Sequence, residues 1–224
     1  MSTPETTPTA DPRLAHLAAL RAANPGARIV LLSAGEGESA VCFGARLPDS
    51  AEWAIVAADL QGSNADAAEL ALRRAVVGTT AEETTAERAR LEALLDDDPP
   101  LGDFWGMQLL QAVGMGAKVT TAPKPDAAGL YELRAALPGA ALQVGGEVVL
   151  QCRKRSRPQW AMLRDIAAKK GPQAFGSAAY DMLVVSANKA DVAALYPALV
   201  GPLGDAAASA GSRAETGAPF GLSR

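Results

Sequence analysis

Apolar and polar positions follow two different periods in the first half of the chain. Asp11 and Pro12 are typical of the start of a helix. The apolar positions after them predict a helix that ends at Asn24, because the residue before a proline disfavours helical backbone. Short apolar runs at 28–33 and 40–43, joined by a Gly-rich turn, predict a β-hairpin. The helical period returns after this hairpin.

Four helices are expected to follow the hairpin. Asp49 and Glu52 have the spacing of a capping box, and Trp53 begins the apolar stripe of the first of these helices. Glycine and proline clusters then separate one helix from the next. The three later helices are predicted to carry Ala67 to Val77, to run from Thr80 to Leu95, and to run from Leu101 to Val113 with Gly114 as its C-cap.

The second half is expected to repeat this series of elements. Its apolar positions again change from a short first segment to strands and then to helical spacing. The predicted elements are a helix over 130–137, a turn at Pro138-Gly139, strands around 141–144 and 147–153, and helices that begin near Gln159, Gln173, Lys189 and Leu203.

Matching residues in a constant order support a tandem duplication. Two of the three tryptophans and both cysteines take part in these matches. Two copies are too few for a solenoid, so we expect two small domains or one pseudo-symmetric pair. The matches are L-A-A-L-R-A-A-N-P-G-A from Leu17 with L-Y-E-L-R-A-A-L-P-G-A from Leu130, Cys42 and Pro48 with Cys152 and Pro158, Trp53 with Trp160, and Pro100–Asp103 with Pro202–Asp205.

These patterns predict an α+β fold that is predominantly α. Each repeat is expected to hold a short helix, a β-hairpin and a small helical bundle. A unit of about 100 residues buries only roughly two-thirds of its unfolded surface, so each repeat should be modestly stable by itself. The predicted segments are a disordered leader over 1–11, a first repeat over 12–118, a Pro-rich linker over 119–127, a second repeat over 128–211 and a flexible tail over 212–224.

Composition narrows the classes of function. A formal net charge of −4 gives no general attraction to nucleic acid or to anionic lipid. One histidine and two cysteines are too few for the usual structural zinc site. The first residues are polar and acidic, unlike a signal peptide, and no apolar run approaches the roughly 20 residues that span a bilayer. We expect a soluble, cytoplasmic protein without a metal or another cofactor.

Three features resemble catalytic or nucleotide-binding motifs. Gly35 to Ala40 contain G-x-G-x-x-A after a strand, but a dinucleotide site needs a helix directly after the glycines, and the sequence predicts a strand there. The run Gly114–Lys118 lacks the ending of a phosphate loop. The only histidine, His16, has no nucleophile or orienting acid near it in sequence. We therefore predict a protein that is not an enzyme.

Partner binding is the remaining source of specific function. Trp53 and Trp160 begin equivalent helices and are expected to be core anchors, with partner contact as the alternative. A basic run between a strand and the Trp160 helix either contacts phosphates, docks on an acidic partner such as the other repeat, or forms a solvated edge. The candidate partner-binding residues are Phe104, Trp105, Met107 and Leu110 in the last helix of the first repeat, and Arg153, Lys154, Arg155 and Arg157 in the basic run.

Each repeat, taken whole, resembles the small tail assembly chaperones of tailed bacteriophages and prophages. The likeness rests mainly on apolar and turn positions. This chain differs from the family in being doubled, which indicates an internal dimer or a structural protein with a new role. The matching residues are Arg46-Leu47-Pro48, Glu52-Trp53, Val76-Val77, Leu91–Asp96, Pro99, Leu101 and Gly114, and in the second repeat Arg157-Pro158, Gln159-Trp160, Val184-Val185, Ala194-Leu195 and Pro202-Leu203.

The resemblance implies a non-catalytic function. Such chaperones are thought to coat the long helical tape-measure protein and to deliver tail-tube subunits to it, in the cytoplasm of the host. The implied partners are therefore tape-measure helices, tail-tube subunits or both. A second hypothesis is a structural tail or capsid component that stays in the particle. An enzyme that uses the Gly35 loop is a third.

Overall fold

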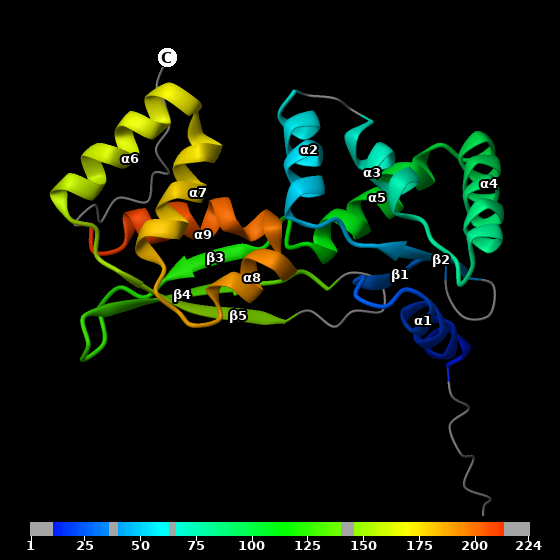
Figure 1. The fold of residues 1–224 in the computed structure, drawn as a ribbon, viewed down its shortest axis with the longest axis horizontal. Coiled ribbons are helices and arrows are strands. Elements are labelled where there is room, and N and C mark those ends of the chain that lie inside the picture. The colour runs from blue at the N-terminus through cyan, green and yellow to red at the C-terminus, as the bar shows by residue number, and fades with distance from the viewer. Residues whose placement is uncertain (1–10, 36–39, 63–65, 140–145, 213–224) are drawn as a thin grey trace, which may run out of the picture. The chain divides into compact units, whose positions relative to one another are not determined.

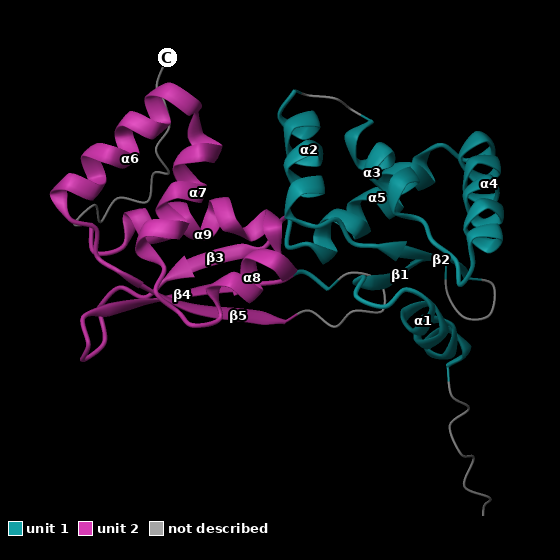
Figure 2. Ribbon diagram, in the orientation of Figure 1, with its two compact units in different colours: residues 1–115, 138–145 teal, residues 116–137, 146–224 magenta. Residues whose placement is uncertain are grey.

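A computed structural model describes residues 11–35, 40–62, 66–139 and 146–212 of the chain. Helices make up 58% of the structure and strands 17%, which confirms the prediction of an α+β fold that is predominantly α. The chain forms two compact units, coloured separately in Figure 2. Unit 1 comprises residues 1–115 and 138–145, and unit 2 comprises residues 116–137 and 146–224. Each unit is described by itself.

Unit 1 is a two-stranded hairpin between helical layers (Figure 1). The strands β1 and β2 are antiparallel and place Leu32 opposite Phe43. Asp49 and Glu52 form the predicted capping box at the start of the helix after the hairpin. The elements of unit 1 are α1 (Pro12–Ala23), β1 (Ile29–Ala34), β2 (Val41–Arg46), α2 (Ser50–Gln61), α3 (Ala67–Ala75), α4 (Ala81–Asp97) and α5 (Pro100–Ala112).

Both faces of the β1–β2 hairpin are covered. On one face, Leu17 and Leu20 of α1 pack against Ile29 and Leu31. The other face meets α5, where the ring of Trp105 contacts Phe43 edge-on at 5.1 Å between centroids. Because both faces are covered, four successive residues of β1, Ile29–Leu32, are buried.

Unit 2 contains a three-stranded antiparallel sheet in the order β3-β4-β5 (Figure 1). Burial alternates strictly along β5, with Val148, Leu150 and Cys152 buried and their neighbours exposed. One face of the sheet therefore packs on the core and the other face is exposed to solvent. The elements are β3 (Lys118–Thr121), β4 (Leu130–Ala136), β5 (Glu147–Arg153), α6 (Arg157–Lys170), α7 (Pro172–Leu183), α8 (Lys189–Leu195), a 3₁₀ turn (Pro197–Leu199) and α9 (Val200–Ser209).

The two units share a series of elements from the hairpin onward. In unit 1 an isolated β-bridge joins Ala45 to Val76 just after α3, and in unit 2 the corresponding bridge joins Cys152 to Val184 just after α7. Both second strands are followed by a capping box and a helix. The equivalent pairs are β1 with β4, β2 with β5, α2 with α6, α3 with α7, α4 with α8 and α5 with α9.

The structure corrects the sequence matches between the repeats. Cys152 is equivalent to Ala45 rather than to Cys42, because these two residues form the corresponding bridges. In the last helices, the buried run Trp105, Gly106, Leu109, Leu110 reappears as Leu203, Gly204, Ala207, Ala208. The identical tetrapeptides Pro100–Asp103 and Pro202–Asp205 are therefore not structurally equivalent. Their positions in the two helices differ by one helical turn.

The sequence match between the run from Leu17 and the run from Leu130 is also wrong. Residues 17–23 belong to α1, whereas the similar run from Leu130 forms strand β4, so the helix predicted over 130–137 does not exist. Tyr131, Leu133 and Ala135 of this run are buried in alternation, which is the period of a strand. Pairing with β5 and β3 overrides the local helical propensity. Among the residues that the structure describes, helix α1 thus has no counterpart in unit 2, and β3 has none in unit 1.

Smaller differences concern segment boundaries. Strand β3 includes residues 119–121 of the predicted Pro-rich linker. Helix α3 ends at Ala75, before the predicted Val77, whose N–H instead donates to the carbonyl of Gly44 at 2.9 Å. The strand predicted at 141–144, the leader residues 1–10, the turn residues 36–39 and the tail from 213 lie outside the described residues.

Candidate partner-binding surfaces

The predicted binding residues of α5 divide between the core and the surface. Trp105 and Leu110 are fully buried, so they are core residues and not available to a partner. Phe104 and Met107 are 49% and 40% exposed and lie three residues apart on the outer face of the helix. The close approach of Gly106 to the backbone of Ala68 turns the Trp105 side of α5 inward.

The basic run of unit 2 is partly used inside the unit. The guanidinium of Arg155 donates to the carbonyl of Ala208 near the C-terminus of α9, donates to Ser212 Oγ at 3.0 Å, and lies 4.5 Å from the ring centroid of Trp160. A cation at a helix C-terminus interacts favourably with the helix dipole. Burial lowers the pKa of Arg155. Arg155 is therefore a structural residue.

The other members of the run differ from Arg155. Arg153 donates to the carbonyl of Met182 at 2.8 Å, which ties the end of β5 to α7. Lys154 and Arg157 are exposed. Three of the four residues that the sequence suggested as one surface are thus exposed, and one of these, Arg153, is hydrogen-bonded within the unit.

A surface that the sequence did not indicate lies between α2 and α3 of unit 1. There a cavity of about 240 Å³ opens to solvent. An apolar cavity of about 150 Å³ accommodates benzene in another protein, so this one has room for a large apolar side chain. Its lining residues are Arg46, Pro48, Glu52, Ile55, Val56, Ala71, Arg74, Ala75 and Leu109.

The floor of this cavity is apolar and buried. Leu109 of α5 is fully buried, and Ala71, Ala75 and Val56 are nearly so. Ile55, in contrast, is 55% exposed, although it is a large aliphatic side chain. The alanines of α3 leave a space that larger side chains would fill. The sequence alone does not reveal this space, because alanines are common in helices and nothing in the sequence shows that these face α2.

Charged groups form the rim of the cavity. Arg46 makes a bidentate pair with Glu52, with Nη1 to Oε2 at 2.9 Å, and Glu52 also accepts from the backbone N–H of Asp49 at 3.0 Å. The hydrogen bond from Arg46 lowers the pKa of Glu52 below its ordinary value of 4.5. Arg74 is exposed and forms no ion pair with the described residues, whereas its neighbour Arg73 pairs with two glutamates. The rim therefore carries one uncompensated positive charge.

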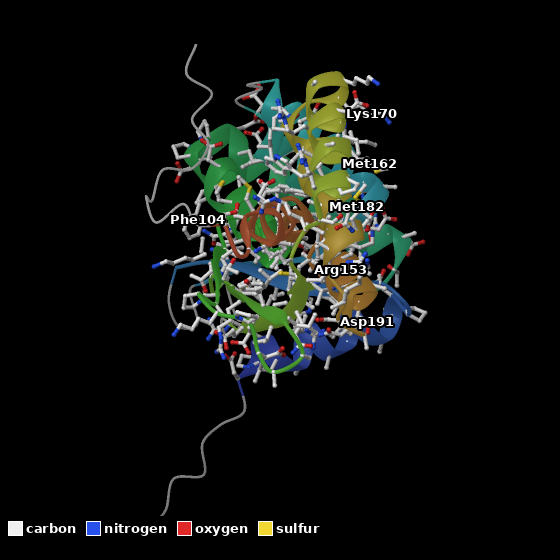
Figure 3. The ribbon with its side chains drawn as sticks, turned by 90° about the vertical axis from the view of Figure 1, so that its left-hand side faces the viewer. Phe104, Arg153, Met162, Lys170, Met182 and Asp191 are labelled. Atoms are coloured by element: carbon white, nitrogen blue, oxygen red, sulfur yellow. The ribbon has the colours of Figure 1, made fainter. Side chains whose placement is uncertain are left out.

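Unit 2 presents an equivalent face with different chemistry. Arg153 ends β5 as Arg46 ends β2, so these two arginines correspond, and the earlier match of Arg46 with Arg157 is replaced. Met162 takes the place of Ile55 and is 56% exposed. Met182 takes the place of Arg74. Figure 3 shows Met162, Met182 and Arg153 along one side of the unit.

Comparisons with known proteins give no relative for this arrangement. No family model, no curated protein and no solved structure matches the chain. Within the described residues, no helix combines the length and the apolar character needed to cross a membrane. Over the same residues, no three histidine, cysteine or acidic side chains come together as metal ligands.

Proposed function

We propose that this chain is a non-enzymatic protein that binds helical segments of a partner, in the manner of a bacteriophage tail assembly chaperone. The observation that carries the proposal is the equivalent exposure of Ile55 on α2 and Met162 on α6. In a monomeric protein, scattered exposed apolar residues are ordinary. Exposure of a large apolar side chain at the same position of two equivalent helices is more specific, because α2 and α6 are otherwise identical only at the Trp-Ala pair before this position.

The chemistry of these faces suits helix binding. Helices α2 and α6 each contact mainly one neighbouring helix, α3 and α7 respectively, so each leaves one flank open. Amphipathic helices bind in grooves through apolar residues at helical spacing. Tape-measure helices expose such apolar stripes and are the first proposed partner. Tail-tube subunits are the second. Binding would take place in the cytoplasm of the host cell.

Affinity purification tests this proposal. The tagged full-length chain is isolated from cells that produce it, and purified mature particles are analysed by mass spectrometry in parallel. Capture of a long helical protein together with absence of the chain from particles supports the assembly chaperone. Stoichiometric presence in particles supports the alternative of a structural tail or capsid component. Failure of both contradicts the proposal.

A further inference from the structure

The α2–α3 cavity of unit 1 has the properties of a specific site for one kind of helix. This inference rests on the proposed function and adds the chemistry of the partner. We infer that the cavity binds one large apolar side chain of an acidic amphipathic helix, and that a carboxylate of this helix pairs with Arg74.

The shape of the cavity favours a helix over an extended segment. Its walls come mainly from α2 and α3, and its floor comes from Leu109 of α5. Strand β2 contributes only its last residue, Arg46, whose side chain is bound to Glu52. A third helix lies in the groove between two packed helices by placing its ridge of side chains there. The exposed Ile55 extends the apolar surface at the edge of the groove.

The charges of the rim select an acidic partner. Glu52 is already bound by Arg46, so this pair contributes little net charge. Arg74 has no carboxylate among the described residues, and an approaching carboxylate would form a charge-assisted hydrogen bond with it. A basic helix would instead meet a like charge. One uncompensated cation is too little for a nucleic acid, which requires a row of phosphate contacts.

The equivalent face of unit 2 carries its positive charge at a different position. Met182 replaces Arg74, and Gln159 replaces Glu52, so this face carries methionines on α6 and α7 and its cation, Arg153, at the end of β5. Methionine side chains adapt to irregular partner surfaces. A cation at the position of Arg74, on the helix that lines the cavity, is therefore found in unit 1 and not in unit 2.

Titration with designed helices tests the inference on the purified full-length chain. The probe is a stapled peptide of roughly 18 residues, long enough to be helical, with leucines along one stripe and glutamates beside them. One control peptide has lysine in place of glutamate, and the other has alanine in place of leucine. Binding is followed by amide chemical shifts, which also report whether each variant is folded.

The expected result is specific to the cavity. The Leu/Glu peptide shifts resonances around Ala71 and Ala75. Ile55→Ser and Arg74→Glu each weaken its binding on the order of tenfold, whereas Leu14→Ser and Lys124→Glu do not. Leu14 is equally exposed and Lys124 is also exposed, and both lie outside the cavity. Arg74→Glu restores binding of the lysine peptide.

Three results would overturn the inference. These are no binding of the Leu/Glu peptide, equal binding of the glutamate and lysine peptides to the unaltered chain, or unchanged affinity in Ile55→Ser and Arg74→Glu. The proposed function fails separately, when no helical protein is captured from producing cells. Capture that persists in both variants leaves the proposed function intact and rejects the cavity as its site.

Discussion

Gly204 of α9 lies so close to Gly176 of α7 that a Cβ atom on Gly204 would overlap the carbonyl oxygen of Gly176. The equivalent pair in unit 1 is Gly106 and Ala68, where a Cβ on Gly106 would lie 2.7 Å from the carbonyl oxygen of Ala68. Contacts of this kind let two helix backbones approach directly. A glycine at a close backbone contact thus holds α5 against α3 in unit 1 and α9 against α7 in unit 2.

Replacing Gly204 should destabilise unit 2 strongly. In Gly204→Ala the added methyl group meets backbone, which cannot move aside as a flexible side chain would. We expect a loss of about 3 kcal/mol or more in the free energy of unfolding, at the upper end for overpacked sites. Urea unfolding followed by circular dichroism measures it.

Gly201→Ala is the matched control in the same helix. A Cβ at Gly201 has no neighbour within 4 Å. Alanine is the better helix former, so a change between zero and a gain of about 1 kcal/mol is expected. Equal losses in the two variants would show that the α7–α9 approach does not stabilise the unit.

The Arg46–Glu52 pair should make unit 1 less stable in acid. Because the folded pKa of Glu52 is lowered, its contribution is present above the unfolded value near 4.5 and disappears as the pH falls through the folded value. Both side chains are 39% exposed, so the pair contributes only about 0.5–1 kcal/mol. Glu52→Gln should lose this amount at pH 7 and differ little from the unaltered chain at pH 3.

Glu82→Gln provides the control for this charge change. Glu82 also lies in the first turn of a helix, α4, but no ion pair joins it to another described residue. Urea unfolding at several pH values compares the two variants. A loss at pH 7 of the same size in Glu82→Gln would assign the effect to the helix terminus rather than to Arg46.

Arg155→Lys should destabilise unit 2 by about 1–2 kcal/mol. Lysine keeps the charge but cannot reproduce the planar group that contacts Ala208, Ser212 and Trp160 together. Arg157→Lys, at an exposed position in the same run, should change stability by less than about 0.5 kcal/mol. Hydrogen exchange of the C-terminal turn of α9 locates the loss. Equal exchange in both variants would contradict the structural role of Arg155.

The sequence predicted correctly those helices and strands whose ends are marked by capping residues or turn glycines. The capping box before Trp53 and the Gly-rich hairpin turn gave α2, β1 and β2 nearly as observed, whereas the capping box before Trp160 was found only in the structure. Residues 130–136 lacked such a signal. Their Leu- and Ala-rich run suits a helix, and only pairing with β3 and β5 makes it a strand. Contacts between segments distant in sequence cannot be read from periodicity.

The candidate site was less predictable than the fold. Apolar spacing identified α5 as amphipathic but assigned Trp105 to the wrong side, because the approach of Gly106 to Ala68 depends on tertiary packing. The cavity depends on alanines of α3 facing α2, which a sequence presents only as ordinary helix formers. The equivalence of Ile55 and Met162 follows from the sequence match of Trp53 with Trp160, but their exposure depends on which side of α2 and α6 packs against the rest of each unit.

The two cysteines should differ sharply in reactivity. Cys152 is fully buried, and burial raises the pKa of its thiol to about 11, so at pH 8 about one in a thousand is thiolate. Cys42 is half-buried. Alkylation followed by mass spectrometry should label Cys42 first and Cys152 only in denaturant, with Cys42→Ser and Cys152→Ser assigning each rate. Rapid labelling of Cys152 in the native chain would contradict the core of unit 2.

Photo-crosslinking in producing cells tests the central claim most directly. A benzophenone amino acid replaces Ile55, Met162 or, as the control of equal exposure, Leu14. If the α2 and α6 faces bind the partner, positions 55 and 162 crosslink to a long helical protein and position 14 does not. Absence of crosslinks at 55 and 162, or equal yields at all three positions, would contradict partner binding through the α2 and α6 faces.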